Sequence, residues 1–413
     1  MEWNAMMIDF ILIVSFAAAG AFIGAVTGII PGLHTNNIAI LLLAILSAAG
    51  IGIYLCILIV AAAISHTFLD IIPSTFIGAP EEDTALLVLP AHSMVLQGRG
   101  YEAICISALA SLASVAVCFA LLLPFRFVME EPINFYEIIE KNMPWILICI
   151  SAIVIFTNEN IWKAILIFLL AGIFGMVIID LNTSFLIQSS PIFPALAGLF
   201  GAPALLYAEK KILPEQNLEA EEIRVKKRDI GGGVMAGGIV AILPGVSSAI
   251  ASTLALALKR ERSNEAIVAI LSATNTATNF FVLASLFIIL KARSGFAIVM
   301  REFINVEKWS GFLIPYPYNL LLIAVIVSST ISYFLTKHIG KFVAKNISRI
   351  SYRRLIRISI SIILIMVFLF TGFLGLLIFG VASLIGITCL EMKVRRSVCM
   401  GVLLVPLILN YFL

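Results

Sequence analysis

The sequence has 413 residues, of which 61% are hydrophobic and 12% are charged. Soluble domains carry about 25% charged residues, and apolar runs near the ~20 residues that a bilayer crossing needs recur along this chain. These features exclude a soluble protein and predict an all-α, polytopic integral membrane protein of roughly ten to twelve transmembrane helices. The net charge of +3 is small, and we expect the lipid bilayer, not nucleic acid, as a partner.

The apolar runs predict the spans in chain order. Spans are expected near residues 8–30, 51–72, 103–124, 145–157, 161–180, 190–208, 230–258 (broken at Pro244), 264–290, 312–335, 355–371, 373–390 and 397–413, with short segments near 38–48 and 84–97. The segment before the first span is acidic, which argues against a cleaved signal peptide. The six cysteines lie in apolar runs without a CxxC pair, so we interpret them as packing residues and expect no metal site.

The orientation in the cell membrane is predicted from the connections rich in Lys and Arg, which face the cytoplasm. The connection 337–357 contains basic residues and no acidic residue, and the connection 209–229 is also rich in basic residues. Both should be cytoplasmic, which predicts an external C-terminus. No Lys or Arg precedes Arg99, so the orientation of the N-terminus stays open.

A polar segment interrupts the first long apolar region. Pro31 and Gly32 are followed by four polar residues ending at Asn37, with apolar runs on both sides. Each unpaired backbone group in hydrocarbon costs several kcal/mol, so a broken helix persists only where it is buried in protein or lines a cavity. The segment therefore predicts a broken or re-entrant helix.

The same pattern occurs in the second half of the chain at a constant offset. The matching positions are Gly20, Gly24, Pro31 and Gly32 in the first half and Gly233, Gly237, Pro244 and Gly245 in the second. We therefore expect two pseudo-symmetric membrane repeats, 1–208 and 230–413, joined by the polar cytoplasmic linker 209–229. Interrupted hydrophobic segments at corresponding positions of two halves indicate the binding site of a transporter.

A helix that resumes after a Pro-Gly break presents unpaired N–H groups and the positive end of its dipole, which suits an anion. Capping of two helix ends is the alternative for either motif alone, and the pair favours a binding site. The candidate substrate-binding residues at the breaks are Gly32, His34, Thr35, Asn36, Asn37, Gly245, Ser247 and Ser248.

Two further polar positions lie in apolar surroundings. Asn275, Thr276 and Asn279 belong to a polar stretch that we interpret as lining the substrate cavity, with interhelical hydrogen bonding as the alternative. Asp70 and Asp83 are candidates for binding a coupling ion, Na⁺ or H⁺. Asp70 could instead lie near a helix end in solvent, and Asp83 could belong to an acidic helix N-terminus.

No protease, P-loop or hydrolase motif is present in the sequence, so we expect no catalytic residue, no cofactor and no enzymatic activity. The alternative is a membrane-embedded enzyme acting on a lipid or polyprenyl substrate, for which Glu81, Glu82 and Asp83 are the available carboxylates. A non-catalytic membrane scaffold is the third possibility.

The motifs resemble those of the large permease subunit of the tripartite tricarboxylate transporters, the TctA family. The resemblance rests on GAFIGAVTGIIPGLHTNN, GGGVMAGGIVAILPGVSSAIAS and the segment from Ile77 to Ala103, and it covers about residues 16–400. This chain is short and divergent, with His34 near the first Pro-Gly break. The resemblance implies a secondary active transporter for a small organic anion, a di- or tricarboxylate, coupled to sodium or protons. It also implies a small membrane subunit and an extracytoplasmic binding protein as partners.

Overall fold

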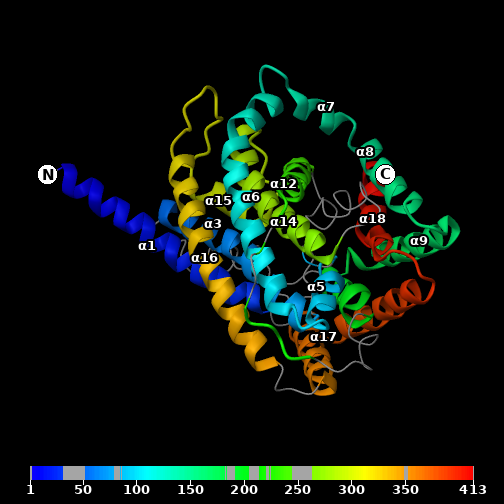
Figure 1. Ribbon diagram of the computed structural model, residues 1–413. Helices are drawn as coiled ribbons and strands as arrows, with labels where there is room; N and C mark the ends of the chain where they lie inside the picture. Colours follow the sequence, from blue (N-terminus) through cyan, green and yellow to red (C-terminus); the bar gives the residue numbers. More distant parts are fainter. Residues whose placement is uncertain are drawn as a thin grey trace.

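The computed structural model describes residues 2–30, 52–78, 84, 86–181, 183, 191–203, 214–219, 223, 225–243, 263–347 and 352–412. Every regular element in this part of the chain is a helix (Figure 1). The elements are α1 (Glu2–Ile29), α3 (Gly52–Leu69), α4 (Ile71–Phe76), α5 (Val88–Val95), α6 (Gly100–Met129), α7 (Phe135–Lys141), α8 (Met143–Phe156), α9 (Ile161–Ile178), α10 (Ile192–Leu196), the π-helix η2 (Ala197–Gly201), α12 (Lys227–Ala241), α14 (Asn264–Ile288), α15 (Gly295–Phe303), α16 (Tyr318–Ile347), α17 (Tyr352–Glu391), the 3₁₀ helix η3 (Arg396–Met400) and α18 (Gly401–Phe412).

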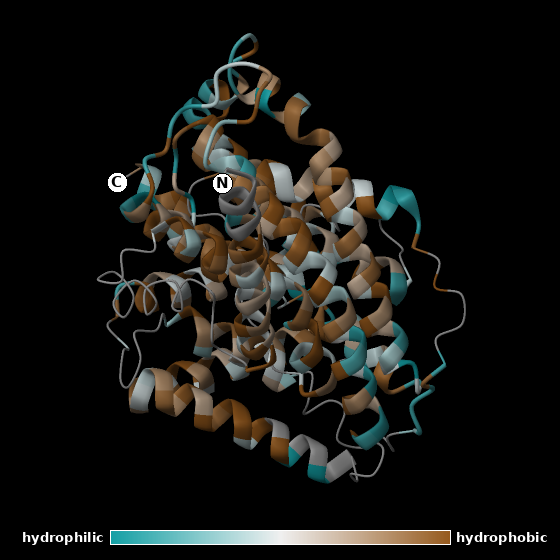
Figure 2. Ribbon diagram, turned by 90° about the vertical axis from the view of Figure 1, so that its left-hand side faces the viewer, coloured by the Kyte–Doolittle hydropathy of each residue, from teal (hydrophilic) through white to brown (hydrophobic). Residues whose placement is uncertain are grey.

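Seven helices in the described ranges are long and apolar enough to cross a membrane, and a bent pair makes an eighth candidate. The bent pair is α7 and α8, which meet at 74°. Figure 2 shows hydrophobic residues along most of the helices and hydrophilic residues mainly at helix ends and in connecting segments. The all-α polytopic membrane class is confirmed.

One expected boundary agrees with the structure and another differs from it. The expected spans 355–371 and 373–390 lie within α17, and the backbone at Gly372 is not helical, so two helical segments meet at the residue that was expected to separate them. Its φ of 65° is one that only glycine adopts without strain. α16 continues to Ile347, into the expected connection 337–357. Lys337, Lys341 and Lys345 lie in this last part of α16. Because they are spaced four residues apart, they share one face of the helix, and Lys341 and Lys345 are exposed.

Two helix pairs pack in the same way. Gly20 and Gly24 of α1 lie so close to the carbonyl oxygens of Leu58 and Ala62 in α3 that a Cβ on either would fall within 3.0 Å of them. Gly233 and Gly237 of α12 meet the carbonyl oxygens of Ile270 and Thr274 in α14 in the same manner. The contacted residues of α14 follow those of α3 in the sequence by nearly the same number of positions as the glycines of α12 follow those of α1. The two spacings agree to within one residue. Small residues permit such close contacts between membrane helices.

The two pairs run in opposite directions. Residue numbers increase together along the contacts of α1 with α3 and of α12 with α14, so the helices of each pair are parallel. α3 is antiparallel to α14, because Thr67 contacts Thr276 whereas Gly52, at the start of α3, lies against Phe303, beyond the end of α14. α1 and α12 end at Ile29 and Ala241, shortly before the two Pro-Gly motifs. The breaks themselves lie outside the described residues.

The long helices define two ends of the molecule. Arg99 and Glu265 form an ion pair at the start of α6 and α14, and the Lys341 ammonium lies over the ring of Tyr101 at the same end. Gln216, from the linker, accepts a hydrogen bond from the backbone N–H of Gly100 there. We call this the Arg99 end. Both connections that we expected on one side of the membrane, 209–229 and 337–357, therefore reach the same end through their described residues.

The opposite end carries the connections after α6 and α14. Lys308 and Glu130 form an ion pair at 2.7 Å, and Lys291 lies 3.6 Å from Glu140. The C-terminal helix α18 ends near these residues, where the ring of Phe412 contacts that of Trp145. The chain therefore ends on the side of the molecule away from the Arg99 end.

Candidate functional site

The two helix pairs meet at a polar contact between α3 and α14. Asn275 Nδ2 donates a hydrogen bond of 2.7 Å to Asp70 Oδ2, and the hydroxyl oxygens of Thr67 and Thr276 lie 3.0 Å apart. None of these four side chains is more than 3% exposed. We call the four residues the α3–α14 seam. Buried polar groups are retained where they bond to one another, and this seam joins the two parts of the chain.

The direction of each hydrogen bond in the seam follows from its surroundings. Thr67 donates its hydroxyl proton to the carbonyl oxygen of Ile64, at 2.8 Å, so the contact with Thr276 uses the proton of Thr276. The Asn275 amide must present its nitrogen to Asp70, because two acceptor oxygens would repel each other. Its Oδ1 atom is then buried without a hydrogen-bond partner among the described residues. The seam therefore holds more acceptors than donors.

Asp70 lies at the junction of α3 and α4, within one apolar segment from Gly52 to Phe76. Its backbone N–H donates to the carbonyl oxygen of His66, and Ser74 donates its hydroxyl to the carbonyl oxygen of Asp70. The residue is 3% exposed. The alternative that Asp70 lies in solvent at a helix end is therefore wrong, although it does lie at a helix end.

The remaining polar residues of α14 bond elsewhere. Asn279 donates its amide to the carbonyl oxygen of Asn275 in its own helix, at 3.3 Å, and no hydrogen bond among the described residues brings it to the seam. Ser272 donates to the hydroxyl of Ser107 in α6, at 2.8 Å. Interhelical hydrogen bonding, the alternative role of this stretch, is therefore observed both for Ser272, which bonds to α6, and for Asn275 and Thr276, which bond to α3 and its junction with α4.

His66 belongs to a contact that the sequence did not predict. Its Nδ1 atom lies 3.0 Å from the hydroxyl of Thr27, and that hydroxyl donates to the carbonyl oxygen of Gly24. The proton of the contact therefore resides on His66 Nδ1. His66 is 3% exposed and ties α3 to the last turns of α1. Its spacing of four residues from Asp70 was the available signal that both lie on one helix face.

The candidate residues at the two breaks lie outside the described residues. They are Gly32, His34, Thr35, Asn36, Asn37, Gly245, Ser247 and Ser248. Asp83, with its neighbours Glu81 and Glu82, also lies outside them. In the part of the chain that the structure describes, no group of three or more His, Cys, Asp or Glu side chains is arranged to hold a metal ion.

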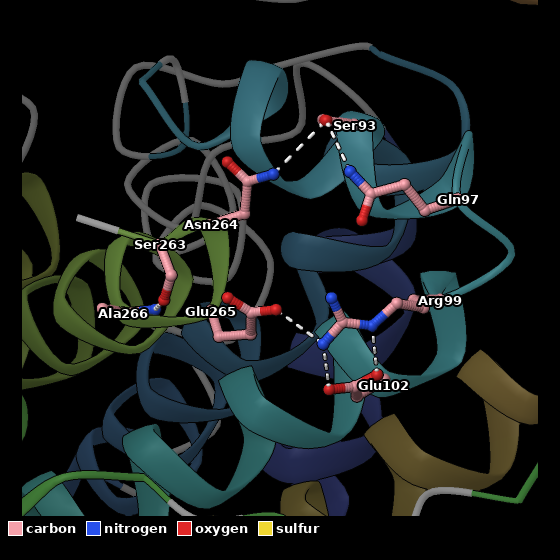
Figure 3. Close-up of polar contacts among 8 residues, drawn as sticks. All are labelled: Ser93, Gln97, Arg99, Glu102, Ser263, Asn264, Glu265 and Ala266. Atoms are coloured by element: carbon pink, nitrogen blue, oxygen red, sulfur yellow. Dashed lines mark hydrogen bonds and ion pairs between the residues drawn. The ribbon is translucent and has the colours of Figure 1, made fainter. Parts of the chain in front are cut away.

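A charged cluster connects the starts of α6 and α14 at the Arg99 end (Figure 3). Arg99 donates to Glu102 at 2.6 Å and to Glu265, in the first turn of α14, at 2.5 Å. Beside it, Asn264 donates its amide to the hydroxyl of Ser93 at 3.3 Å. The hydrogen bond to Glu102 raises the pKa of Arg99, with Glu265 adding to the effect and partial burial opposing it. We call Arg99, Glu102 and Glu265 the Arg99 cluster.

The cluster and the seam share helix α14, which contributes Glu265 to the cluster and Asn275 and Thr276 to the seam. Asn275 follows Glu265 by ten positions in α14, which corresponds to about 15 Å along the helix axis. The residues between them pack against α6 and α12.

Comparison with known proteins identifies the chain's relatives. The model of a family described as "Tripartite tricarboxylate transporter TctA family" matches residues 14–401. An uncharacterised protein of Methanocaldococcus jannaschii is 28% identical over 405 residues, which cover 95% of this chain and 97% of that protein. No solved structure matches the chain.

Proposed function

The chain belongs to the tripartite tricarboxylate transporter TctA family, and we propose that it is a secondary active permease for a small organic anion, a di- or tricarboxylate, driven by sodium or protons. The family is one of transporters. The observation that carries the proposal is the pair of similarly packed helix units that run in opposite directions and meet at the buried α3–α14 seam. Secondary transporters bind their substrates near such interfaces, where one unit rocks against the other.

The substrate site we propose lies at the two Pro-Gly breaks. α1 and α12 end shortly before them, so each break follows a helix that is tightly packed on its neighbour through two glycines. Helix N-termini after the breaks would present N–H groups to the substrate carboxylates. His34, Thr35, Asn36 and Asn37 would add donors in one repeat, and Ser247 and Ser248 in the other.

We propose that the Arg99 end faces the cytoplasm and that the C-terminus is external. Lys341 of α16 and Gln216 of the linker, which belong to the two connections rich in Lys and Arg, lie at the Arg99 end, and the positive-inside rule places such connections in the cytoplasm. A small membrane subunit and an extracytoplasmic binding protein, the partners of this family, would approach from the membrane and from the opposite end. Alkaline phosphatase fused after the last residue should be active in cells, and inactivity would refute this orientation.

Uptake in proteoliposomes tests the function. Labelled di- and tricarboxylates are supplied with an inward gradient of sodium or of protons. We expect accumulation of at least one anion, and its loss on replacing Asn36 and Ser248 by alanine. Thr330→Val is the matched control, because Thr330 is exposed and its hydroxyl bonds within α16. Equal uptake by the double variant and the control would refute the substrate site, and absence of uptake for every anion under both gradients would refute the function.

A further inference from the structure

Two pairs of buried oxygen-bearing side chains, Asp70 with Asn275 and Thr67 with Thr276, make up the α3–α14 seam. The carboxylate of Asp70 accepts a hydrogen bond from Asn275, whose own Oδ1 atom is buried without a hydrogen-bond partner among the described residues. A buried acceptor without a partner is destabilising, and each one in a native structure calls for an unseen proton donor or cation. The amide cannot turn over to relieve this, because its nitrogen is committed to the carboxylate.

The two threonines supply further oxygen atoms beside this pair. Thr67 lies one turn before Asp70 on α3, and Thr276 directly follows Asn275 on α14. The protons of both hydroxyls are already used, one toward Ile64 and one between the threonines. The lone pairs that remain can accept a bond but cannot be matched by a donor from the seam itself.

We propose that Thr67, Asp70, Asn275 and Thr276 form a sodium-binding site. The four side chains offer a carboxylate, an amide oxygen and two hydroxyls, an all-oxygen set that suits a hard cation. One carboxylate balances one positive charge, whereas sites for divalent ions use more carboxylates or phosphate oxygens. Two ligands come from α3 and its junction with α4, and two come from α14, so the ion bridges the two oppositely directed helix units.

The site changes the role of two residues from the one their sequence context indicated. Asn275 and Thr276 were candidates for binding the substrate, but the Asp70 carboxylate lies 2.7 Å from the Asn275 amide. A carboxylate substrate there would face a like charge in a buried environment. The sodium ion, unlike the carboxylate substrate, is attracted to the position beside the Asp70 carboxylate. That this ion drives uptake rests on the proposed function, whereas its binding does not.

Sodium binding to the purified full chain tests the inference. Equilibrium binding of ²²Na⁺ and thermal unfolding are measured against NaCl at constant ionic strength, with choline chloride as the replacement salt. We expect saturable binding that raises the unfolding temperature, and at least a tenfold weaker affinity in Asp70→Asn and in Asn275→Ala. Thr278→Val is the matched control: its hydroxyl bonds to the carbonyl oxygen of Thr274 within α14, and its affinity should stay within twofold of the parent.

A conservative pair separates ligation from folding. Thr276→Ser keeps the hydroxyl and should keep the sodium affinity within about threefold, whereas the isosteric Thr276→Val should lose it. Sodium affinity that is equal in the two variants, or unchanged by Asp70→Asn, overturns the site. Stabilisation by low pH alone, without any effect of sodium, also overturns it in favour of a proton on Asp70.

The outcomes distinguish this site from the proposed function. Sodium binding that depends on the four residues, without uptake of any anion, leaves the site standing and removes the transport proposal. Anion uptake driven by a gradient, without sodium binding at these residues, leaves the transport proposal standing and removes the site.

Discussion

The close packing of α12 on α14 predicts that the same substitution, glycine to alanine, has opposite effects on stability at two positions of α12. A Cβ on Gly237 would lie 2.8 Å from the carbonyl oxygen of Thr274, and its other neighbours at 2.9 Å are also parts of α14. These atoms belong to a packed helix and cannot move away alone. Gly232, in the same helix, is exposed, and a Cβ added to it would meet no atom within 4 Å.

The expected magnitudes follow from two effects. Replacing glycine by alanine in a helix gains about 1 kcal/mol at either position. Overpacking a tight contact costs about 1–3 kcal/mol, and this cost applies only at Gly237. Gly237→Ala should therefore be less stable than Gly232→Ala by about 1–3 kcal/mol, and Gly232→Ala should be at least as stable as the parent chain.

Thermal unfolding in detergent, followed by intrinsic tryptophan fluorescence, measures the difference. Gly24→Ala extends the test to the first pair, because a Cβ there would approach the Ala62 carbonyl oxygen and lie 2.7 Å from Ser65 Cβ. If Gly237→Ala matches Gly232→Ala in unfolding temperature, α12 and α14 are not in the close contact described, and the duplicated packing of the two helix pairs is refuted with it.

Three further predictions concern other contacts. Ser272→Ala removes the hydrogen bond to Ser107 between α14 and α6 and should lower the free energy of unfolding by about 1 kcal/mol; no change in chemical denaturation would show that the bond adds nothing. Arg99→Gln and Glu265→Gln should show a coupling energy of about 0.2–1 kcal/mol in a double-mutant cycle, because both side chains are about one-third exposed. That coupling should weaken between low and high salt, and an unscreened value would contradict a solvent-accessible pair. Gly372→Ala should destabilise α17 by about 1–3 kcal/mol through its positive φ, seen as a lower unfolding temperature; an unchanged unfolding temperature would contradict a strained backbone at this residue.

The sequence carried much of the information about class. A chain that is 61% hydrophobic is too apolar for a soluble protein. The polytopic helical class could therefore be predicted without any knowledge of the tertiary structure. The sequence singled out Gly20, Gly24, Gly233 and Gly237 as matching positions of two repeats, and only the structure shows that they are positions of close helix contact. Hydrophobicity could not locate the end of α16, because Lys337 and Lys341 are good helix formers that belong to a connection only by their charge.

The candidate site was predicted in part. Asp70, Asn275 and Thr276 were singled out one by one as polar residues in apolar surroundings, and the structure brings these three together. Asn279 has the same residue type as Asn275 one turn along the same helix, yet it bonds within α14. Thr67 gave no signal of its own, because threonine also occurs in membrane helices for reasons unrelated to binding, and the signal for His66 was its spacing of four residues from Asp70.

Composition and spacing alone thus determined that this chain crosses the membrane repeatedly and that its glycine and proline positions recur. Only the tertiary structure decided that the two units run in opposite directions and that α3 crosses α14 at Asp70 and Asn275. The reason is physical: helix periodicity specifies which face of one helix is polar, whereas the partner of that face is some two hundred residues away in the chain. The partner is selected by the packing of all the helices between them.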